Sequence, residues 1–225
     1  MLNDNSTPNS ANKYDCNISK DIPYYEALHT EILEFAQCCK EKYLTWLDTG
    51  CGTGSFGCKI TKKSLARKLI LADPSPNMLE IARERNSEKN TIFYNSKTQD
   101  LQFENDSIDI ITAIQAHHYE NKHERKIATT NCFRMLMKNG LYITSENCYP
   151  SDETSTEIFL RYWRNYQIAA GKSKEEANNH MKRFNTAYFP ISIDDHINLY
   201  KEIGFNRIEI LWKSYMQVAF VMIKG

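Results

Sequence analysis

Residues 47–57 read Leu-Asp-Thr-Gly-Cys-Gly-Thr-Gly-Ser-Phe-Gly, and they continue an apolar run at 43–48 that is typical of a buried strand. Glycines directly after a strand let the backbone approach a ligand closely. A helix that begins at Ser55 turns its free N–H groups toward the same ligand. The stretch therefore predicts a strand, a binding loop and a helix at 55–65, which together open an α/β sheet.

Beyond this loop, strands and helices alternate along the chain. Apolar runs predict strands at 68–73, 91–95, 107–116 and 141–146, and periodic segments predict helices at 23–40, 75–85, 123–138 and 193–203. Ser75 is an expected N-cap, and Asn139-Gly140 is the expected stop of the helix at 123–138. This alternation predicts a parallel sheet with helices on both faces.

Three segments depart from the alternation. Residues 1–12 are rich in Asn, Ser and Pro and predict a disordered tail, which leaves a single domain at 13–225. Residues 151–189 contain two polar helical stretches, 154–170 and 173–184, and predict a helical cap insertion. Runs at 206–212 and 216–223 are joined by a link so short that they must pair antiparallel. The expected fold is α/β, with a Rossmann-like seven-stranded, mostly parallel sheet, an antiparallel last strand and a helical cap.

Composition excludes several classes of protein. The 225 residues carry 28 basic and 28 acidic side chains, and because nucleic-acid binders usually concentrate basic charge, no nucleic acid is expected as a partner. The chain lacks an apolar run of about 18 residues and a signal peptide, so we expect a cytoplasmic protein without a membrane span. The cysteines show no zinc-like spacing, and no metal is expected. The oligomeric state is left open as a monomer or a homodimer.

Two ligands compete for the glycine-rich loop. Residues 52–57 satisfy the pattern GxGxxG, and Asp73 follows about 20 residues later, as a dinucleotide-binding fold requires. One step earlier, Asp48, Gly50, Gly52 and Gly54 form a pattern that resembles the first motif of class I S-adenosylmethionine (SAM) dependent methyltransferases. A carboxylate beside the loop suits the ammonium group of SAM and is unfavourable beside a pyrophosphate. The charge therefore favours SAM.

The resemblance covers roughly residues 14–225. Residues 105–119 and 137–143 are similar to the fourth strand and the step into the fifth strand of the methyltransferase type 11/25 group, which includes ubiquinone-biosynthesis and trans-aconitate methyltransferases. The resemblance to this family implies that Asp73 binds the ribose hydroxyls of SAM and that Met78 lies near its adenine. The stretch 95–101 departs from the family because its acidic position falls to Lys97, Thr98 or Asp100. The implied SAM site comprises Tyr14, Asp48, Gly50, Gly52, Gly54, Asp73, Met78, Lys97, Thr98 and Gln115.

Methyl transfer needs the acceptor in line with the methyl group, and a hydroxyl or amine acceptor also needs a base. His117 and His118 follow the fourth strand, where substrates bind in such sheets, although one of them could equally pack and the other face solvent. A carboxylate or thiolate acceptor would need no base. Aromatic and guanidinium groups near the cap could clamp an anionic acceptor, and the expected substrate residues are Tyr25, Arg161, Trp163 and Tyr188, with Arg183 beside them.

The expected function is methyl transfer from SAM to a small-molecule acceptor. One alternative is an NAD(P)-dependent oxidoreductase, which is weakened because the chain has no YxxxK pair of the short-chain type. The other is a SAM-binding regulator without catalysis. An enclosed polar pocket under the cap would favour the enzyme, and an open flat face would favour the regulator.

Overall fold

The computed structural model describes residues 4–39, 44–150 and 152–225. Its main sheet has the strand order β3-β2-β1-β4-β5-β8-β7. β1 to β5 run parallel, whereas β8 is antiparallel to both of its neighbours, β5 and β7, which confirms the predicted reversed last strand. A two-residue strand, β6 Ile191–Ser192, pairs with β5 outside this path. The seven main strands are β1 Leu44–Thr49, β2 Ala66–Asp73, β3 Thr91–Asn95, β4 Ile108–Ile114, β5 Leu136–Tyr149, β7 Arg207–Ser214 and β8 Gln217–Ile223.

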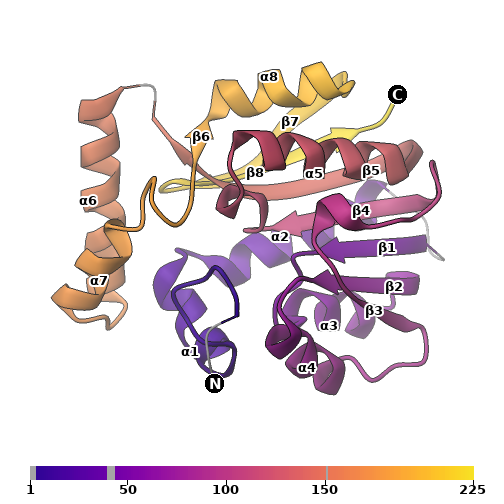
Figure 1. Ribbon diagram of the computed structural model, residues 1–225, viewed down its shortest axis with the longest axis horizontal. Helices are drawn as coiled ribbons and strands as arrows, with labels where there is room; N and C mark the ends of the chain where they lie inside the picture. Colours follow the sequence, from indigo (N-terminus) through magenta and orange to yellow (C-terminus); the bar gives the residue numbers. More distant parts are fainter. Residues whose placement is uncertain (1–3, 40–43, 151) are drawn as a thin grey trace.

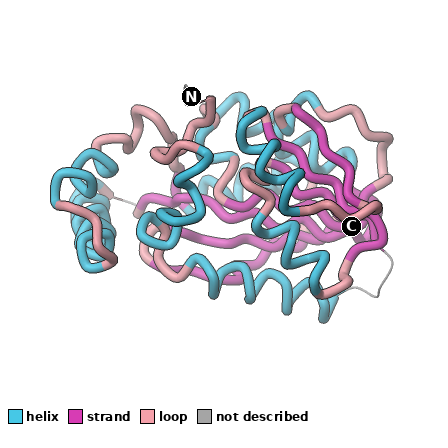
Figure 2. Tube along the Cα trace, turned by 90° about the horizontal axis from the view of Figure 1, so that it is seen from below, coloured by secondary structure: helices cyan, strands magenta, loops and turns pink. Residues whose placement is uncertain are grey.

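Helices cover both faces of this sheet (Figures 1 and 2). Successive side chains of a strand point to opposite faces, so Trp46 joins one core cluster and Leu47 joins the other. The Trp46 side packs against α2 Tyr25–Cys39, α3 Ser55–Lys62 and α4 Pro76–Arg85. The Leu47 side packs against α5 Lys122–Met135 and α8 Ile193–Ile203. The helices predicted at 55–65 and 75–85 are confirmed, and the Ser75 hydroxyl caps α4 by accepting from Met78 N.

The predicted cap is present as two helices, α6 Glu153–Ala169 and α7 Lys174–Met181, which stand beyond the end of the sheet (Figure 1). Between them and the sheet lies α1 Ala11–Asp21. The indole of Trp163 is fully buried, and its Nε1 donates to the Asp21 carbonyl at 2.7 Å. Trp163 therefore joins the cap to α1, and an aromatic core with Tyr25, Tyr188 and Met216 fills the junction.

Two expectations differ from the structure. The helix predicted to reach Lys138 ends at Met135, because Leu136 already pairs with Ile108 in the parallel sheet and the left-handed Asn139 (φ 58°) lies within β5. The tail predicted at 1–12 contacts the start of α4 through Asp4 and continues into α1 from Ala11, while residues 1–3 and the predicted strand start at 43 lie outside the described residues. Within the described ranges, no helix is both long and apolar enough to cross a membrane.

Candidate active site

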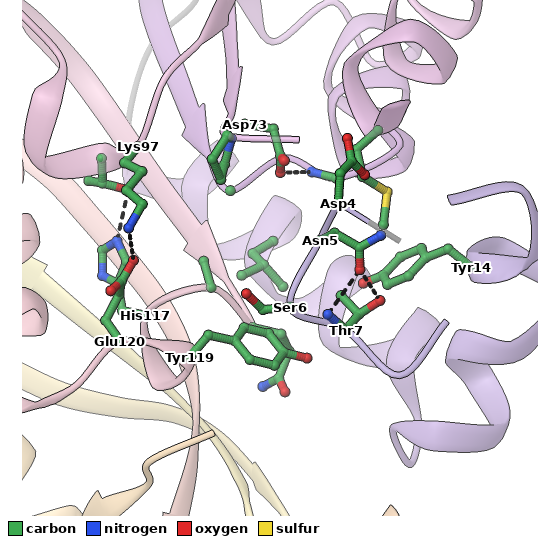
Figure 3. Close-up of a pocket in the computed structure, with 18 of the residues that line it drawn as sticks. Asp4, Asn5, Ser6, Thr7, Tyr14, Asp73, Lys97, His117, Tyr119 and Glu120 are labelled. Carbon is green, nitrogen blue, oxygen red and sulfur yellow. Dashed lines mark hydrogen bonds and ion pairs between the residues drawn. The ribbon is translucent and has the colours of Figure 1, made fainter. Parts of the chain in front are cut away.

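A cavity opens at the carboxyl ends of the parallel strands, where ligands bind in such sheets (Figure 3). The loop after β1, the end of β2, the turn after β3 and the end of β4 form its walls. Eight of the predicted cofactor residues line this main cavity: Tyr14, Gly50, Gly52, Asp73, Met78, Lys97, Thr98 and Gln115. The two others, Asp48 and Gly54, lie outside its lining.

The glycines of the loop have different structural roles. Gly50 has φ 66°, and a Cβ there would lie 2.5 Å from the Cβ of Ala116, so no side chain fits between the loop and the end of β4. Gly52 has φ 53° and open space around its Cβ position. A Cβ on Gly54 would instead meet Asn86 at 2.5 Å and Ala82 at 3.0 Å. Gly54 therefore allows α3 and α4 to pack closely, whereas Gly50 and Gly52 face the cavity.

Two carboxyl groups stand at the acidic end of the site. Asp73 Oδ2 accepts from Gly52 N at 2.8 Å and Oδ1 accepts from Ser75 N at 2.9 Å. Burial raises the pKa of Asp73 to about 6 in spite of these bonds. Burial also raises the pKa of Asp48 to about 7, where the Thr112 hydroxyl bond (2.7 Å) opposes the shift and the charge of Asp73 adds to it. A cationic or hydroxyl-bearing ligand beside these two carboxyl groups would favour their ionised form.

The N-terminal residues close one side of the main cavity. Asp4 Oδ1 accepts from the Ser75 hydroxyl at 2.6 Å, and Oδ2 accepts from Asn77 N at 3.1 Å, which places a carboxylate at the positive end of α4. Asn5, Ser6 and Thr7 follow along the cavity wall (Figure 3). Sequence analysis missed this segment because it carries no apolar periodicity.

The helix that follows is tied to the same loop. Asp15 forms an ion pair with Arg85 of α4 and accepts from the Thr53 hydroxyl at 2.8 Å. These contacts bring the phenol of Tyr14, at the start of α1, to the wall of the main cavity. The resemblance predicted Tyr14 at this site, and the structure places it there.

The two histidines after β4 have different surroundings. His117 lines the main cavity, but its Nε2 lies 3.1 Å from the Thr98 hydroxyl and its Nδ1 lies 3.2 Å from the Tyr142 hydroxyl. Both ring nitrogens of His117 therefore have hydrogen-bond partners within the protein. His118 instead lines a smaller neighbouring cavity, which we call the acceptor cavity.

The acceptor cavity shares Thr7, Tyr14, Gln115 and Tyr119 with the main cavity. Arg183 and Tyr188 form its far wall. The Nε of Arg183 and the hydroxyl of Tyr188 are buried and have no hydrogen-bond partner within the part of the chain that the structure describes. Burial raises the pKa of Tyr188 above its ordinary range although Arg183 opposes the shift, so the phenol stays a neutral donor.

Of the other predicted substrate residues, Tyr188 lines the acceptor cavity, but three lie elsewhere. Tyr25 packs on His29 with ring centroids 4.2 Å apart. Arg161 is exposed on the cap, and Trp163 is buried in the junction between the cap and α1. Position on a cap helix did not distinguish Arg161 and Trp163 from Arg183, because Arg183 follows α7, where the chain returns toward the sheet and reaches the acceptor cavity.

Comparisons with known proteins are in keeping with this geometry. Residues 47–140 match a family described as a methyltransferase domain. The chain is 23% identical to the carboxy-S-adenosyl-L-methionine synthase of Campylobacter lari, over 96% of this chain and 92% of that protein. The enzyme of the same name from Campylobacter hominis is 27% identical, over 91% and 88% of the two chains. A solved SAM-dependent methyltransferase of Thermotoga maritima, described as a possible histamine N-methyltransferase, has TM-score 0.64 and 17% identity over 95% of each chain.

Proposed function

We propose, from the premise that this chain is a class I SAM-dependent methyltransferase, that it methylates a small molecule which carries a carboxylate. The premise rests on the matching methyltransferase domain, the relatives and the shared fold. It sets aside the nicotinamide-dependent alternative. The proposal concerns the acceptor, and the acceptor cavity beside the main cavity supports it.

The residues of the main cavity fit SAM by their chemistry. Asp73 at the end of β2 would accept from the ribose hydroxyls, and the charge of Asp48 would favour the ammonium group. Because Gly50 and Gly52 have no side chains, the ligand can lie directly against the backbone of the loop. The bound cofactor supplies an electrophilic methyl group on a sulfonium. Tyr14, Gln115 and Tyr119, which line both cavities, would surround the place where methyl group and acceptor meet.

One observation carries the assignment of a carboxylate. Arg183 Nε and the Tyr188 hydroxyl are both buried donors without a partner among the described residues. A buried donor left unpaired costs about 1–3 kcal/mol, so such donors are normally filled by a ligand or water. A guanidinium and a neutral phenol together suit the two oxygens of one carboxylate.

The test begins with calorimetric titration of SAM, S-adenosylhomocysteine and NADH, followed by a panel of small carboxylic acids and their amides as acceptors. We expect adenosyl ligands but not NADH to bind, and acids but not amides to be methylated. Arg183→Met should raise the KM of the acid at least tenfold with an unchanged Kd for SAM. Arg161→Met, on the outer surface of the cap, is the matched control. Equal turnover of acids and amides would refute the carboxylate assignment.

A second candidate is the formation of carboxy-SAM, because relatives with that name align with nearly the whole chain. In that case the carboxyl group held by Arg183 would belong to the nucleoside product or to the molecule that donates it. Mass spectrometry of the product nucleoside distinguishes methyl transfer from the formation of carboxy-SAM. Methyl transfer yields S-adenosylhomocysteine, whereas carboxylation yields a nucleoside heavier than SAM by one carboxyl group in place of a hydrogen.

A further inference from the structure

A buried carboxylate stands directly behind His118, and the proposed function leaves it without a role. Glu146 lies in β5, and its Oε2 is 3.5 Å from His118 Nδ1. Each of the two side chains is only 1% exposed. Of the two, His118 lines the acceptor cavity, and Glu146 lies outside its lining.

The two facing atoms have no other partner. Neither His118 Nδ1 nor Glu146 Oε2 has a hydrogen bond to any residue that the structure describes. The other oxygen of the carboxylate, Oε1, accepts from the Thr144 hydroxyl at 2.6 Å, which orients the group. Because an uncompensated buried charge is strongly unfavourable, the carboxylate needs the imidazole N–H as its partner. The separation of 3.5 Å is long for a hydrogen bond, and such contacts often shorten when the site is filled.

The charges around the pair decide where the ring proton sits. Burial alone would raise the pKa of Glu146, but the close approach of His118 Nδ1 at 3.5 Å outweighs burial and lowers it below its ordinary value. Burial lowers the pKa of His118 although Glu146 opposes the shift. At neutral pH the carboxylate is therefore ionised and the imidazole is neutral. The single ring proton then belongs on Nδ1, facing Glu146, and Nε2 keeps its lone pair.

We propose that Glu146 is a positioning residue that holds His118 as the general base for an acceptor hydroxyl or amine in the acceptor cavity. This methyl transfer rests on the proposed function. The acceptor oxygen or nitrogen bonds to the methyl carbon, the carbon–sulfur bond breaks to leave a neutral thioether, and the acceptor proton passes to His118 Nε2. Glu146 stabilises the imidazolium that forms. The substrate class is thereby narrowed to hydroxy acids or amino acids, with the carboxylate on Arg183 and the nucleophile at His118.

Other charged groups around the pair disfavour the imidazolium, so the carboxylate has to offset them. Arg125 of α5 is 1% exposed and lowers the pKa of His118, as does Arg183 beside the acceptor cavity. His196 of α8 and His117 face the same carboxylate. Glu146 is the carboxylate whose close contact and charge raise the pKa of His118, and the buried Asp21 lines the same cavity as His118.

The kinetic test compares Glu146→Gln with the wild-type enzyme on a methylated hydroxy or amino acid. We expect kcat to fall about 100-fold, as for loss of general-base assistance, with the KM of the acceptor and the Kd of SAM within about twofold of wild type. The inflection of kcat with pH should move to lower pH, because the anion that favours the imidazolium is gone. Glu146→Asp should restore part of kcat and move the inflection back. An unmoved inflection, or a loss of kcat matched by equal losses in SAM affinity and melting temperature, would overturn the proposal.

A second measurement uses the wild-type protein and needs no turnover. Nitrogen NMR of the histidine side chains at pH 7 should show Nδ1 of His118 protonated and Nε2 unprotonated, with His118→Gln providing the assignment. The opposite tautomer would overturn the proposal even if Glu146→Gln fails to fold. If no acid is methylated at all, the proposed function fails. The tautomer of His118 still shows whether its Nδ1 proton faces Glu146.

Discussion

Replacing Asp48 by Asn should stabilise the protein and weaken its affinity for SAM. Burial raises the pKa of Asp48 from 3.8 to about 7. A carboxyl group whose pKa is raised on folding costs nothing below the unfolded pKa, and its full cost is present above the folded pKa. Three units at about 1.4 kcal/mol each make the ionised group cost about 4 kcal/mol. Asn keeps an oxygen that can accept from the Thr112 hydroxyl but carries no charge.

Urea unfolding of wild type and Asp48→Asn at several pH values measures this difference. The two should be equally stable near pH 4, diverge as the pH rises through the window from about 4 to about 7, and differ by about 4 kcal/mol at pH 8. In a chain of this size that corresponds to about 10 °C in Tm. Asp106→Asn, at an exposed ion pair with Lys224, is the control and should change stability by less than about 1 kcal/mol. The reasoning is refuted if Asp48→Asn is no more stable than wild type at pH 8.

Two further outcomes follow from the walls of the main cavity. Gly50→Ala should abolish detectable SAM binding in calorimetry, because its Cβ would lie 2.5 Å from Ala116, whereas Gly52→Ala has open space and should weaken binding far less. Equal losses in both variants would show that left-handed backbone alone, and not the close approach, matters there. Asp4→Ala removes the bonds to Ser75 and Asn77 and should speed SAM dissociation about fivefold in stopped-flow measurements. Glu104→Ala, exposed before β4 and outside the lining of the main cavity, is its control, and identical dissociation rates would mean that residues 4–7 do not retain the ligand.

The sequence predicted the sheet well because its strands carry dense local signals. Trp46 and Leu47 alternate between two cores, and Ser75 with Pro76 marks the start of α4 before any long-range contact is known. The end of α5 was missed because strand pairing of Leu136 with Ile108 outweighs the local helical pattern. The stop signal at 139–140 was real, but it marks a left-handed residue inside β5.

The predicted site residues divide in the same way between those that reach the cavities and those that do not. Residues that follow a strand, such as Gly50, Asp73 and Gln115, reach the main cavity because parallel strands end at one edge. Residues placed by the cap could not be sorted, since the direction of Arg161, Trp163 and Arg183 depends on how α6 and α7 turn back toward the sheet. Glu146 was missed because it occupies an ordinary inward position of β5, and nothing local distinguishes a buried carboxylate there from one facing solvent.

One buried cation, Arg125, joins two segments that line the acceptor cavity. Arg125 of α5 donates to the carbonyls of His117, Glu120 and Phe189, so a single side chain joins the end of β4 to the segment that follows the cap. Phe189 N in turn donates to the His118 carbonyl at 2.7 Å. These bonds fix Tyr188, which carries an unpartnered donor, relative to His118, which would take the acceptor proton. The buried contacts that attach Phe189 to the end of β4 therefore also set the separation between Tyr188 and His118.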